Sequence, residues 1–208
     1  MSAKYNFFKT VLADLEVEPK SERVYDLCNA VCMNFIEFTE EPIEPPSSCV
    51  IALAANSGAE FQNAAAAGLS CITDKHLLIN EISNFIEENY QDSAGNVYYS
   101  NYGKRIPGFG HPSIKGEDKR VTFLMNEFRD IFGPRTDFFL NLERLVPVRM
   151  NIGGAMSCLL LDAGIPKECI LYFPLMGRLF GWLKIFNETN KKFNKVIPSN
   201  LFIEQCLK

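Results

Sequence analysis

The chain has 208 residues, a net charge of −4, 47% hydrophobic residues and 22% charged residues. This composition can bury a substantial core, so it excludes a disordered chain and favours one domain, or a large domain with a small lobe. The acidic balance argues against nucleic acid as a partner. No uninterrupted apolar stretch reaches the roughly 18 residues of a membrane span, and the start, MSAKYNFFKT, lacks the apolar core of a signal peptide. We therefore expect no membrane contact.

The seven cysteines form no CxxC pair, so we expect a reduced, cytoplasmic protein. Cys28 and Cys32 lie one helical turn apart, a spacing that could suit a metal ion. Two small core residues on one helix face are the favoured interpretation, and we predict no metal site.

Apolar residues recur at helical spacing through most of the chain, which predicts an all-α fold. The first such segment is 21–38, and a proline-rich stretch at 42–46 ends it. Ser47 or Ser48 is expected to cap the next helical segment, 49–72, which is rich in Ala, Gly and Ser. These small side chains allow close packing, either inside a helical pack or at a subunit contact.

The second half of the chain continues the helical pattern around one long irregular stretch. Residues 91–116 contain five glycines and two prolines and have no sustained period. A loop of this length in a compact protein is usually functional. Further helices are predicted at 76–90, 117–132, 136–146, 152–163 and 167–188. Pro174 is expected to kink the last of them or to mark its start.

The segment RIPGFGHPSIKGEDKR, residues 105–120, places a histidine directly after two closely spaced glycines. Glycine permits positive φ and lets a ligand approach the main chain, whose N–H groups could meet a carbonyl oxygen, a phosphate or an adenine edge. His111 offers a ring nitrogen that can donate a hydrogen bond, and Arg120 offers a planar fork that suits a carboxylate. On these residues alone, a plain turn with a surface histidine remains the alternative.

The same segment resembles the PGFGHPV…DPR signature of the citrate synthase superfamily, and it is most similar to the short citryl-CoA lyase-like branch. Three other segments resemble that family in the same order: AAAAGLSCITDKHLLINE, MNIGGAMSCLLLDAGIP and YFPLMGRLFGWLKIFNE. The likeness extends over residues 50–190, approximately.

The resemblance implies an all-helical homodimer whose subunits each have a large and a small domain. We place the large, dimerisation domain at residues 1–75 and 156–208, and the small, catalytic domain at residues 76–155. In the family, coenzyme A is a substrate in the cleft between the domains, and no cofactor is tightly bound. The reactions form or cleave a carbon–carbon bond between acetyl-CoA and a 2-oxo acid such as oxaloacetate, and some members hydrolyse the thioester.

Both histidines of the chain, His76 and His111, stand at the two histidine positions of the family. The resemblance implies that His76 polarises the thioester carbonyl and that His111 contacts the keto or hydroxyl oxygen of the second substrate, a di- or tricarboxylate. It also implies that Arg120 and Arg178 bind substrate carboxylates, with surface salt bridges as their alternative.

The resemblance places coenzyme A along one loop, whose backbone would read the adenine. That loop consists of Ile106, Pro107, Gly108, Phe109 and Gly110. Lys104, Arg105 and Lys115 could approach the phosphates.

Several positions depart from the family pattern. Gly153 stands where the family motif lNvDGa has the aspartate that transfers a proton, a task that typically contributes about 10²–10⁴-fold to the rate. Leu77 and Leu78 replace the glycines of HGGA, Lys119 replaces the proline of DPR, and Ile197 stands where an arginine often reaches the partner subunit.

These losses leave three interpretations open. The first is an enzyme with altered proton transfer that acts on a CoA thioester and a carboxylated keto or hydroxy acid. The second is a non-catalytic relative that binds a CoA thioester or a di- or tricarboxylate as a regulatory partner. The third is a helical dimerisation scaffold with a relic site. A homodimer is expected, and a hetero-oligomer with a complete homologue remains an alternative.

Overall fold

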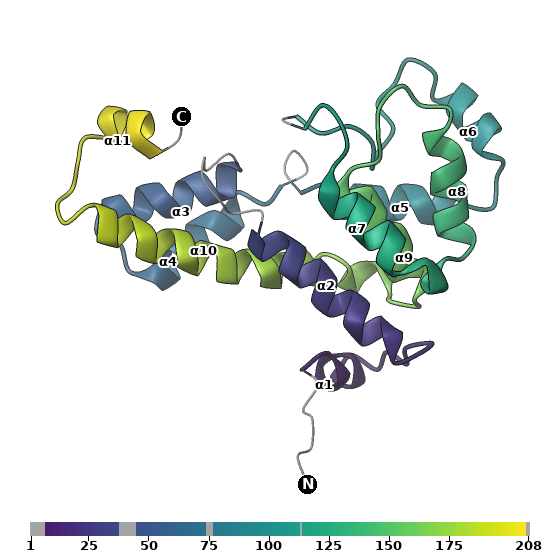
Figure 1. Ribbon diagram of the computed structural model, residues 1–208, viewed down its shortest axis with the longest axis horizontal. Coiled ribbons are helices and arrows are strands. Elements are labelled where there is room, and N and C mark those ends of the chain that lie inside the picture. Colours follow the sequence, from purple (N-terminus) through teal and green to yellow (C-terminus); the bar gives the residue numbers. More distant parts are fainter. Residues whose placement is uncertain (1–6, 38–44, 74–76, 113, 207–208) are drawn as a thin grey trace, which may run out of the picture. The chain divides into compact units, whose positions relative to one another are not determined.

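The computed structural model describes residues 7–37, 45–73, 77–112 and 114–206. Within these ranges the chain forms helices joined by loops, without a strand (Figure 1), which confirms the all-α prediction. Contacts divide it into two compact units. Unit 1 comprises residues 1–31 and 78–173, and unit 2 comprises residues 32–77 and 174–208.

Most of the helices belong wholly to one unit. Unit 1 contains α1 (Phe7–Asp14), the first part of α2 (Arg23–Glu37), α5 (Ile79–Asn89), α6 (Ala94–Ser100), α7 (Lys119–Glu127), α8 (Pro134–Glu143) and α9 (Ile152–Asp162). Unit 2 contains the rest of α2, α3 (Pro46–Asn56), α4 (Phe61–Ser70), nearly all of α10 (Tyr172–Lys192) and α11 (Ser199–Cys206). The predicted small domain begins at residue 76 and the second segment of unit 1 at residue 78, but unit 1 also contains residues 1–31, which were predicted to belong to the large domain. The predicted end of the small domain, at residue 155, falls within α9, whereas unit 1 continues to residue 173. The predicted domain boundaries and roles stay a prediction.

Helix α9 is the centre of unit 1. Its sequence, IGGAMSCLLLD, is apolar on all sides, as expected of a helix that is surrounded by protein, and every one of its residues is buried. Helices α5, α7 and α8 pack against it (Figure 1). The small residues at its beginning let neighbouring backbone and α5 come close, and the candidate site is built around this end.

The other end of α9 fixes the start of α8. Asp162 is buried and accepts hydrogen bonds from the amides of Gly133, Arg135 and Thr136, at 2.9, 3.2 and 2.8 Å. Its carboxylate thus satisfies N–H groups that have no partner within the first turn of α8, and its charge lies at the positive end of that helix. A Cβ at Gly133 would stand 2.8 Å from Oδ1 of Asp162, so glycine is required there.

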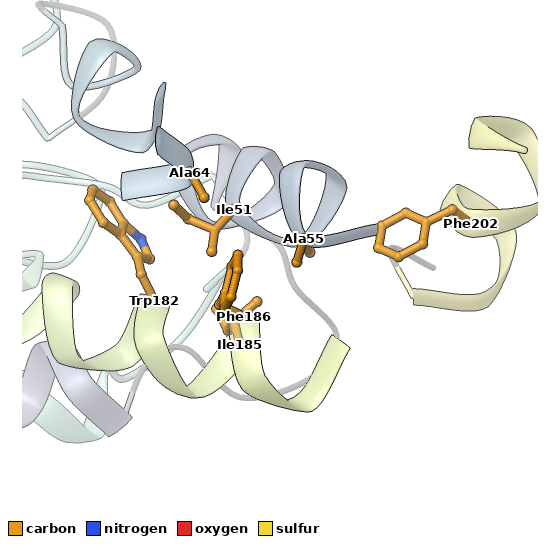
Figure 2. Close-up of a cluster of buried hydrophobic side chains, with 8 residues drawn as sticks. Ile51, Ala55, Ala64, Trp182, Ile185, Phe186 and Phe202 are labelled. Carbon is orange, nitrogen blue, oxygen red and sulfur yellow. The ribbon is translucent and has the colours of Figure 1, made fainter. Parts of the chain in front are cut away.

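The core of unit 2 lies between α3, α4, α10 and α11. Figure 2 shows Trp182, Ile185 and Phe186 of α10 facing Ile51 and its neighbours on α3. Ala52, Ala55, Ala64 and Phe202 complete this buried cluster. Several of the small residues predicted to pack closely therefore lie inside the helical pack, among them Ala52, Ala55, Ala64 and Gly68. Gly68 shows the reason, because a Cβ there would stand 2.8 Å from Cδ1 of Ile51.

Three local predictions need correction. The segment predicted as one helix over 49–72 is two helices, because the chain turns at Gly58, whose φ is +81°. The amides of Gly58 and Ala59 bond back to α3 in the pattern of a Schellman motif. Ser47 and Ser48 do not cap α3: they are buried inside it, after Pro45 at the N-cap. The stretch predicted as an irregular loop over 91–116 contains α6, which Ser93 caps.

Helix α10 begins two residues before Pro174, so this proline marks the helix start as expected. The segment Lys167–Lys192 contains no uninterrupted apolar stretch of 18 residues, yet it is long and apolar enough, by length and composition, to cross a membrane. Half of its most apolar 18-residue stretch is buried inside the protein. Its residues Trp182, Ile185 and Phe186 belong to the core of unit 2. The core helix of a protein can have the same length and apolar composition, so packing explains the composition of this segment.

Candidate functional site

The glycine–histidine loop of unit 1 is held against the segment that leads into α9. The amide of Gly110 donates to the carbonyl oxygen of Arg149 at 2.8 Å, and the amide of Asn151 donates to the carbonyl oxygen of Gly108 at 2.9 Å. These two bonds belong to an isolated antiparallel bridge at Phe109. Nδ2 of Asn151 also donates to the carbonyl oxygen of Gly110 at 2.8 Å. The loop is therefore fixed, and three of its backbone polar groups are already engaged.

Both glycines of the loop are required by its backbone conformation, and Gly108 is also required by its packing. Gly108 and Gly110 have φ values of +87° and +77°, which side chains rarely adopt. A Cβ at Gly108 would also stand 2.6 Å from Cε1 of Phe139 and 3.2 Å from Cα of Gly154. Between the glycines, the ring of Phe109 stacks on Phe139 with 5.1 Å between centroids. The loop thus lies directly on α8 and on the first turn of α9.

A pocket of about 430 Å³ lies beside this loop, within unit 1. Its wall is largely aromatic and aliphatic. The lining residues are Tyr98, Asn101, Tyr102, Gly103, Lys104, Arg105, Ile106, Phe109, Val146, Pro147 and Val148. An apolar pocket with a few charged groups is typical of a small-molecule site. The combination of tyrosine rings with two cations suits a planar ring that carries phosphate.

The residues predicted to contact coenzyme A differ in their surroundings. Ile106 and Phe109 line the pocket, together with the cations Lys104 and Arg105. The carbonyl oxygens of Gly108 and Gly110 and the amide of Gly110 bond to the segment before α9 instead. Pro107 is buried, and Lys115 is exposed. The predicted reading of adenine by the loop backbone stays a prediction.

His111 follows the loop and is half-buried. Its Nδ1 accepts a hydrogen bond from the backbone amide of Ile114, with 3.0 Å between the nitrogens. A neutral imidazole whose Nδ1 accepts carries its proton on Nε2, so Nε2 is the donor. The local turn therefore selects the tautomer that a donor to a substrate oxygen needs.

Arg120 is held by a carboxylate of its own chain. Its Nε lies 2.9 Å from Oδ1 of Asp118 and its Nη2 lies 2.6 Å from Oδ2. Oδ1 of Asp118 also accepts from the amide of Arg120 at 3.0 Å, which caps α7. Burial alone would raise the pKa of Asp118, but the hydrogen bond and charge of Arg120, with a smaller contribution from His111, hold that pKa below its usual value. A substrate carboxylate would meet an arginine that is already oriented and largely neutralised.

Arg178 belongs to the other unit. It lies on α10, is 3% exposed, and its Nη1 donates to Oγ of Ser48 at 3.3 Å. The same hydroxyl accepts from Nε1 of Trp182 at 3.2 Å, and the guanidinium lies 5.6 Å from the ring centroid of Phe35. This environment explains why Ser48 is buried inside α3, and it gives Arg178 a role in the interior of unit 2. Its predicted part in binding a substrate carboxylate stays a prediction.

His76 lies outside the described residues. Leu77, which follows it, has φ +61°, a left-handed conformation that is unfavourable for leucine by roughly 1–2 kcal/mol. Leu78 has an ordinary φ of −63° and stands at the N-cap of α5. The family motif HGGA has glycine at the position of Leu77. The backbone conformation at this position would suit a glycine, and this chain has a leucine there. Strain of this kind is concentrated at functional sites in proteins.

Gly153 and Ile197 both lie in close packing. Gly153 is the second residue of α9, is buried, and follows Asn151, whose side chain caps the helix by accepting from the amide of Gly154 at 3.0 Å. Ile197 packs against the core of unit 2, and its backbone forms two hydrogen bonds with the side chain of Asn56.

The sequence interpretation missed four residues that contribute to the site. Asp118 belongs to the segment DKR that was singled out, and an acidic residue two positions before an arginine at a helix start is the signal that could have found it. Asn151 holds the loop and caps α9, which the motif NIGG also indicates. Tyr98 and Tyr102 line the pocket from the region of α6, which had been predicted as irregular.

The cysteine pair on α2 belongs to the protein interior. Cys28 and Cys32 are both buried, which confirms the core interpretation. Burial raises the pKa of the Cys32 thiol to about 12, which disfavours the thiolate that a metal would need. Among the described residues, no group of three or more His, Cys, Asp or Glu side chains is placed to hold a metal ion.

The citrate synthase C-terminal domain family matches residues 35–198 of the chain. The chain therefore belongs to the citrate synthase family. A comparison with curated proteins gave no match.

Solved structures share the fold at low sequence identity. The citryl-CoA lyase of Hydrogenobacter thermophilus superposes with a TM-score of 0.82 at 22% identity, over 99% of this chain and 84% of that one. The citrate synthase of Thermotoga maritima gives 0.70 at 21% identity, over 86% of this chain and 52% of the other. The ATP citrate lyase of Methanothrix soehngenii, in complex with citrate and coenzyme A, gives 0.68 at 17% identity, over 84% and 32%. This chain thus spans about half the length of the citrate synthase and a third of the ATP citrate lyase.

Proposed function

We propose that this protein binds a CoA thioester together with a carboxylated keto or hydroxy acid, and that it forms or cleaves a carbon–carbon bond or hydrolyses the thioester with altered proton transfer. The observation that carries the proposal is the 430 Å³ pocket, whose tyrosines and cations stand beside the loop that leads to His111. The family membership and the likeness to a citryl-CoA lyase support the same class of ligand.

Each retained residue has a role in this proposal. Nε2 of His111 donates to the keto or hydroxyl oxygen of the acid, because Nδ1 is occupied by the amide of Ile114. Arg120 binds a carboxylate of the same substrate while Asp118 fixes its orientation. His76 polarises the thioester carbonyl, and Arg178 binds a further carboxylate. The 3′-phospho-ADP part of coenzyme A occupies the pocket, with its phosphates toward Lys104 and Arg105.

The second candidate is a non-catalytic protein that binds the same ligands as a regulatory partner. The observation that favours it is Gly153, because glycine has no side chain that could take or return a proton. Both candidates share the binding step and differ in turnover alone.

Calorimetric titration with coenzyme A tests the binding step. Tyr102→Leu removes a ring that lines the pocket and is expected to weaken binding about tenfold, given the usual contribution of an aromatic ring to stacking. Tyr102→Phe should keep most of the affinity, since it keeps the ring. Tyr99→Leu is the matched control, because Tyr99 is equally exposed, at 73% against 72%, and does not line the pocket. Equal losses in Tyr102→Leu and Tyr99→Leu, or no binding by the unaltered protein, would contradict the proposal.

Mass spectrometry after incubation with citryl-CoA separates the two candidates. An enzyme should convert this thioester, and His111→Ala should lose the conversion together with affinity for citrate or oxaloacetate. Unchanged citryl-CoA after hours, with coenzyme A still bound, would favour the regulatory candidate. An unaltered affinity for the acids in His111→Ala would show that the acid binds elsewhere.

We also propose a homodimer. Leu179, Phe180 and Leu183 form an exposed apolar stretch of α10, with Phe180 64% exposed. Light scattering during size-exclusion chromatography should give the mass of two chains, and Phe180→Asp should shift it towards one. Val196→Asp is the control, because Val196 is also strongly exposed and lies outside α10. A monomeric unaltered protein would contradict the proposal.

A further inference from the structure

Helix α5 occupies the space that a side chain at residue 153 would need. A Cβ at Gly153 would stand 2.8 Å from Cδ1 of Ile82 and 3.3 Å from Cδ1 of Ile79. The first distance is shorter than carbon atoms tolerate, so Ile82 would have to move. Ile82 and Ile79 are 3% and 1% exposed, and they lie in the packed contact between α5 and α9.

We infer that Ile82 and Ile79 have taken over this space, so that an apolar contact between α5 and α9 replaces the proton-transferring group of the family site. The inference rests on the proposed function, because that function assigns a chemical role to position 153. It makes Ile82 the residue that decides whether any side chain, and hence any acid or base, can stand at 153.

Two departures from the family pattern are explained together, because side-chain volume is lost on α9 and gained on α5, where the two helices are in contact. Position 153 has lost a side chain, and Ile79, the last residue of HLLI, stands where the motif HGGA ends in alanine. A larger residue on α5 thus accompanies a smaller one on α9. Close-packed interiors lose stability when a side chain is added without such a compensating loss, which explains why the two changes occur together.

A carboxylate placed at 153 would also meet the wrong surroundings. The nearest groups are two isoleucine methyls and Oδ1 of Asn151, which would stand 3.2 Å from the new Cβ. Apolar neighbours disfavour an ionised carboxylate, and the oxygen of Asn151 already caps α9. Restoring proton transfer therefore requires a change in α5 as well as in α9.

Thermal unfolding of alanine variants tests the packing part. Gly153 and Gly95 both stand second in their helices, α9 and α6, but a Cβ at Gly95 meets nothing closer than 4.0 Å. Gly95→Ala should raise the Tm by about 2 °C, since alanine favours a helix over glycine. Gly153→Ala should lower the Tm in the unaltered protein and raise it in an Ile82→Val background, which removes Cδ1. A rise in both backgrounds, or a fall in both, would overturn the inference.

Hydrogen exchange at the substrate tests the chemical part. In D2O, an aspartate at 153 would remove a proton from the methyl group of acetyl-CoA, leave the electron pair in the enolate, and return a deuteron to the same carbon. We expect deuterated acetyl-CoA from Gly153→Asp combined with Ile82→Val, at a rate at least tenfold above that of Gly153→Asp alone. Equal rates would overturn the role of Ile82, as would no exchange by the double variant while it still binds coenzyme A. If the unaltered protein does not bind coenzyme A, the proposed function is rejected instead.

Discussion

Asp118 holds Arg120 at two points, with Nε and Nη2 of the guanidinium at 2.9 and 2.6 Å from the two oxygens of one carboxylate. The pair is largely buried, with side-chain exposures of 5% and 11%. Asp118 also caps α7, so the helix start, the orientation of Arg120 and the charge near His111 depend on one residue.

Two substitutions of Asp118 separate these roles. Asp118→Ala should destabilise the protein by about 1 kcal/mol or more, because the helix cap is lost and Arg120 loses its partner. Asp118→Asn keeps a capping oxygen and should cost less, although it leaves Arg120 uncompensated. Chemical denaturation of the two variants provides the comparison. Equal costs would show that α7 does not depend on this cap.

The pH dependence of stability follows from the lowered pKa of Asp118. Its ionised form is favoured in the folded state, so its contribution is fully present above the ordinary value of 3.8 and is lost as the pH falls through the lower folded pKa. Denaturation measured from about pH 5 to pH 2 should therefore show a shallower loss of stability in Asp118→Asn than in the unaltered protein. Curves of equal slope would contradict the lowered pKa.

Asn151 holds the loop and caps α9, and one substitution can remove the first function while it keeps the second. Asn151→Asp keeps an oxygen for the amide of Gly154 but removes the donor that binds the carbonyl oxygen of Gly110. We expect faster hydrogen exchange of the amides at 108–110 and weaker coenzyme A binding, with α9 still formed. Asn151→Ala should cost about 1 kcal/mol more in unfolding free energy, because the cap is also lost. Unchanged exchange in the loop would show that this hydrogen bond does not hold it.

Gly108 and Gly103 form a matched pair for the close contact of the loop. Both have positive φ, at +87° and +76°, but a Cβ at Gly103 has nothing within 4 Å whereas one at Gly108 meets Phe139 at 2.6 Å. Gly103→Ala should cost about 1 kcal/mol through backbone strain. Gly108→Ala should cost about 1–3 kcal/mol more, because Phe139 has to move. Similar unfolding free energies for the two variants would mean that the loop yields freely.

Leu77 and Leu78 test the strained backbone at the predicted position of a family glycine. Both are half-buried leucines, so Leu→Gly removes a comparable side chain at each. Leu77→Gly should cost about 1 kcal/mol less than Leu78→Gly, because glycine relieves the conformation at φ +61° and gains nothing at φ −63°. Denaturant unfolding of both variants measures the difference, and a larger cost at Leu77 would contradict the strain.

The helical fold and the position of the glycine–histidine loop could be predicted from the residues in chain order. Helical spacing of apolar residues depends on local geometry, so the helices from 117 to 192 were found to within a few residues. Two helix boundaries were missed because the single residues that mark them were overlooked. Gly58 ends α3 in a left-handed conformation, and Ser93 caps the seven-residue α6, which is too short to show a period.

What the singled-out residues contact follows from the packing of distant segments. Gly108 and Gly110 were noted for ligand access, and their carbonyl oxygens bond to Asn151. Tyr102, which was not noted, lines the neighbouring pocket. Gly153 was noted as a lost base, and Ile82 faces it from a segment seventy-one positions earlier in the chain. Such contacts join residues distant in sequence, and they depend on volumes and hydrogen-bond angles that exist only once α5, α8 and α9 are packed together.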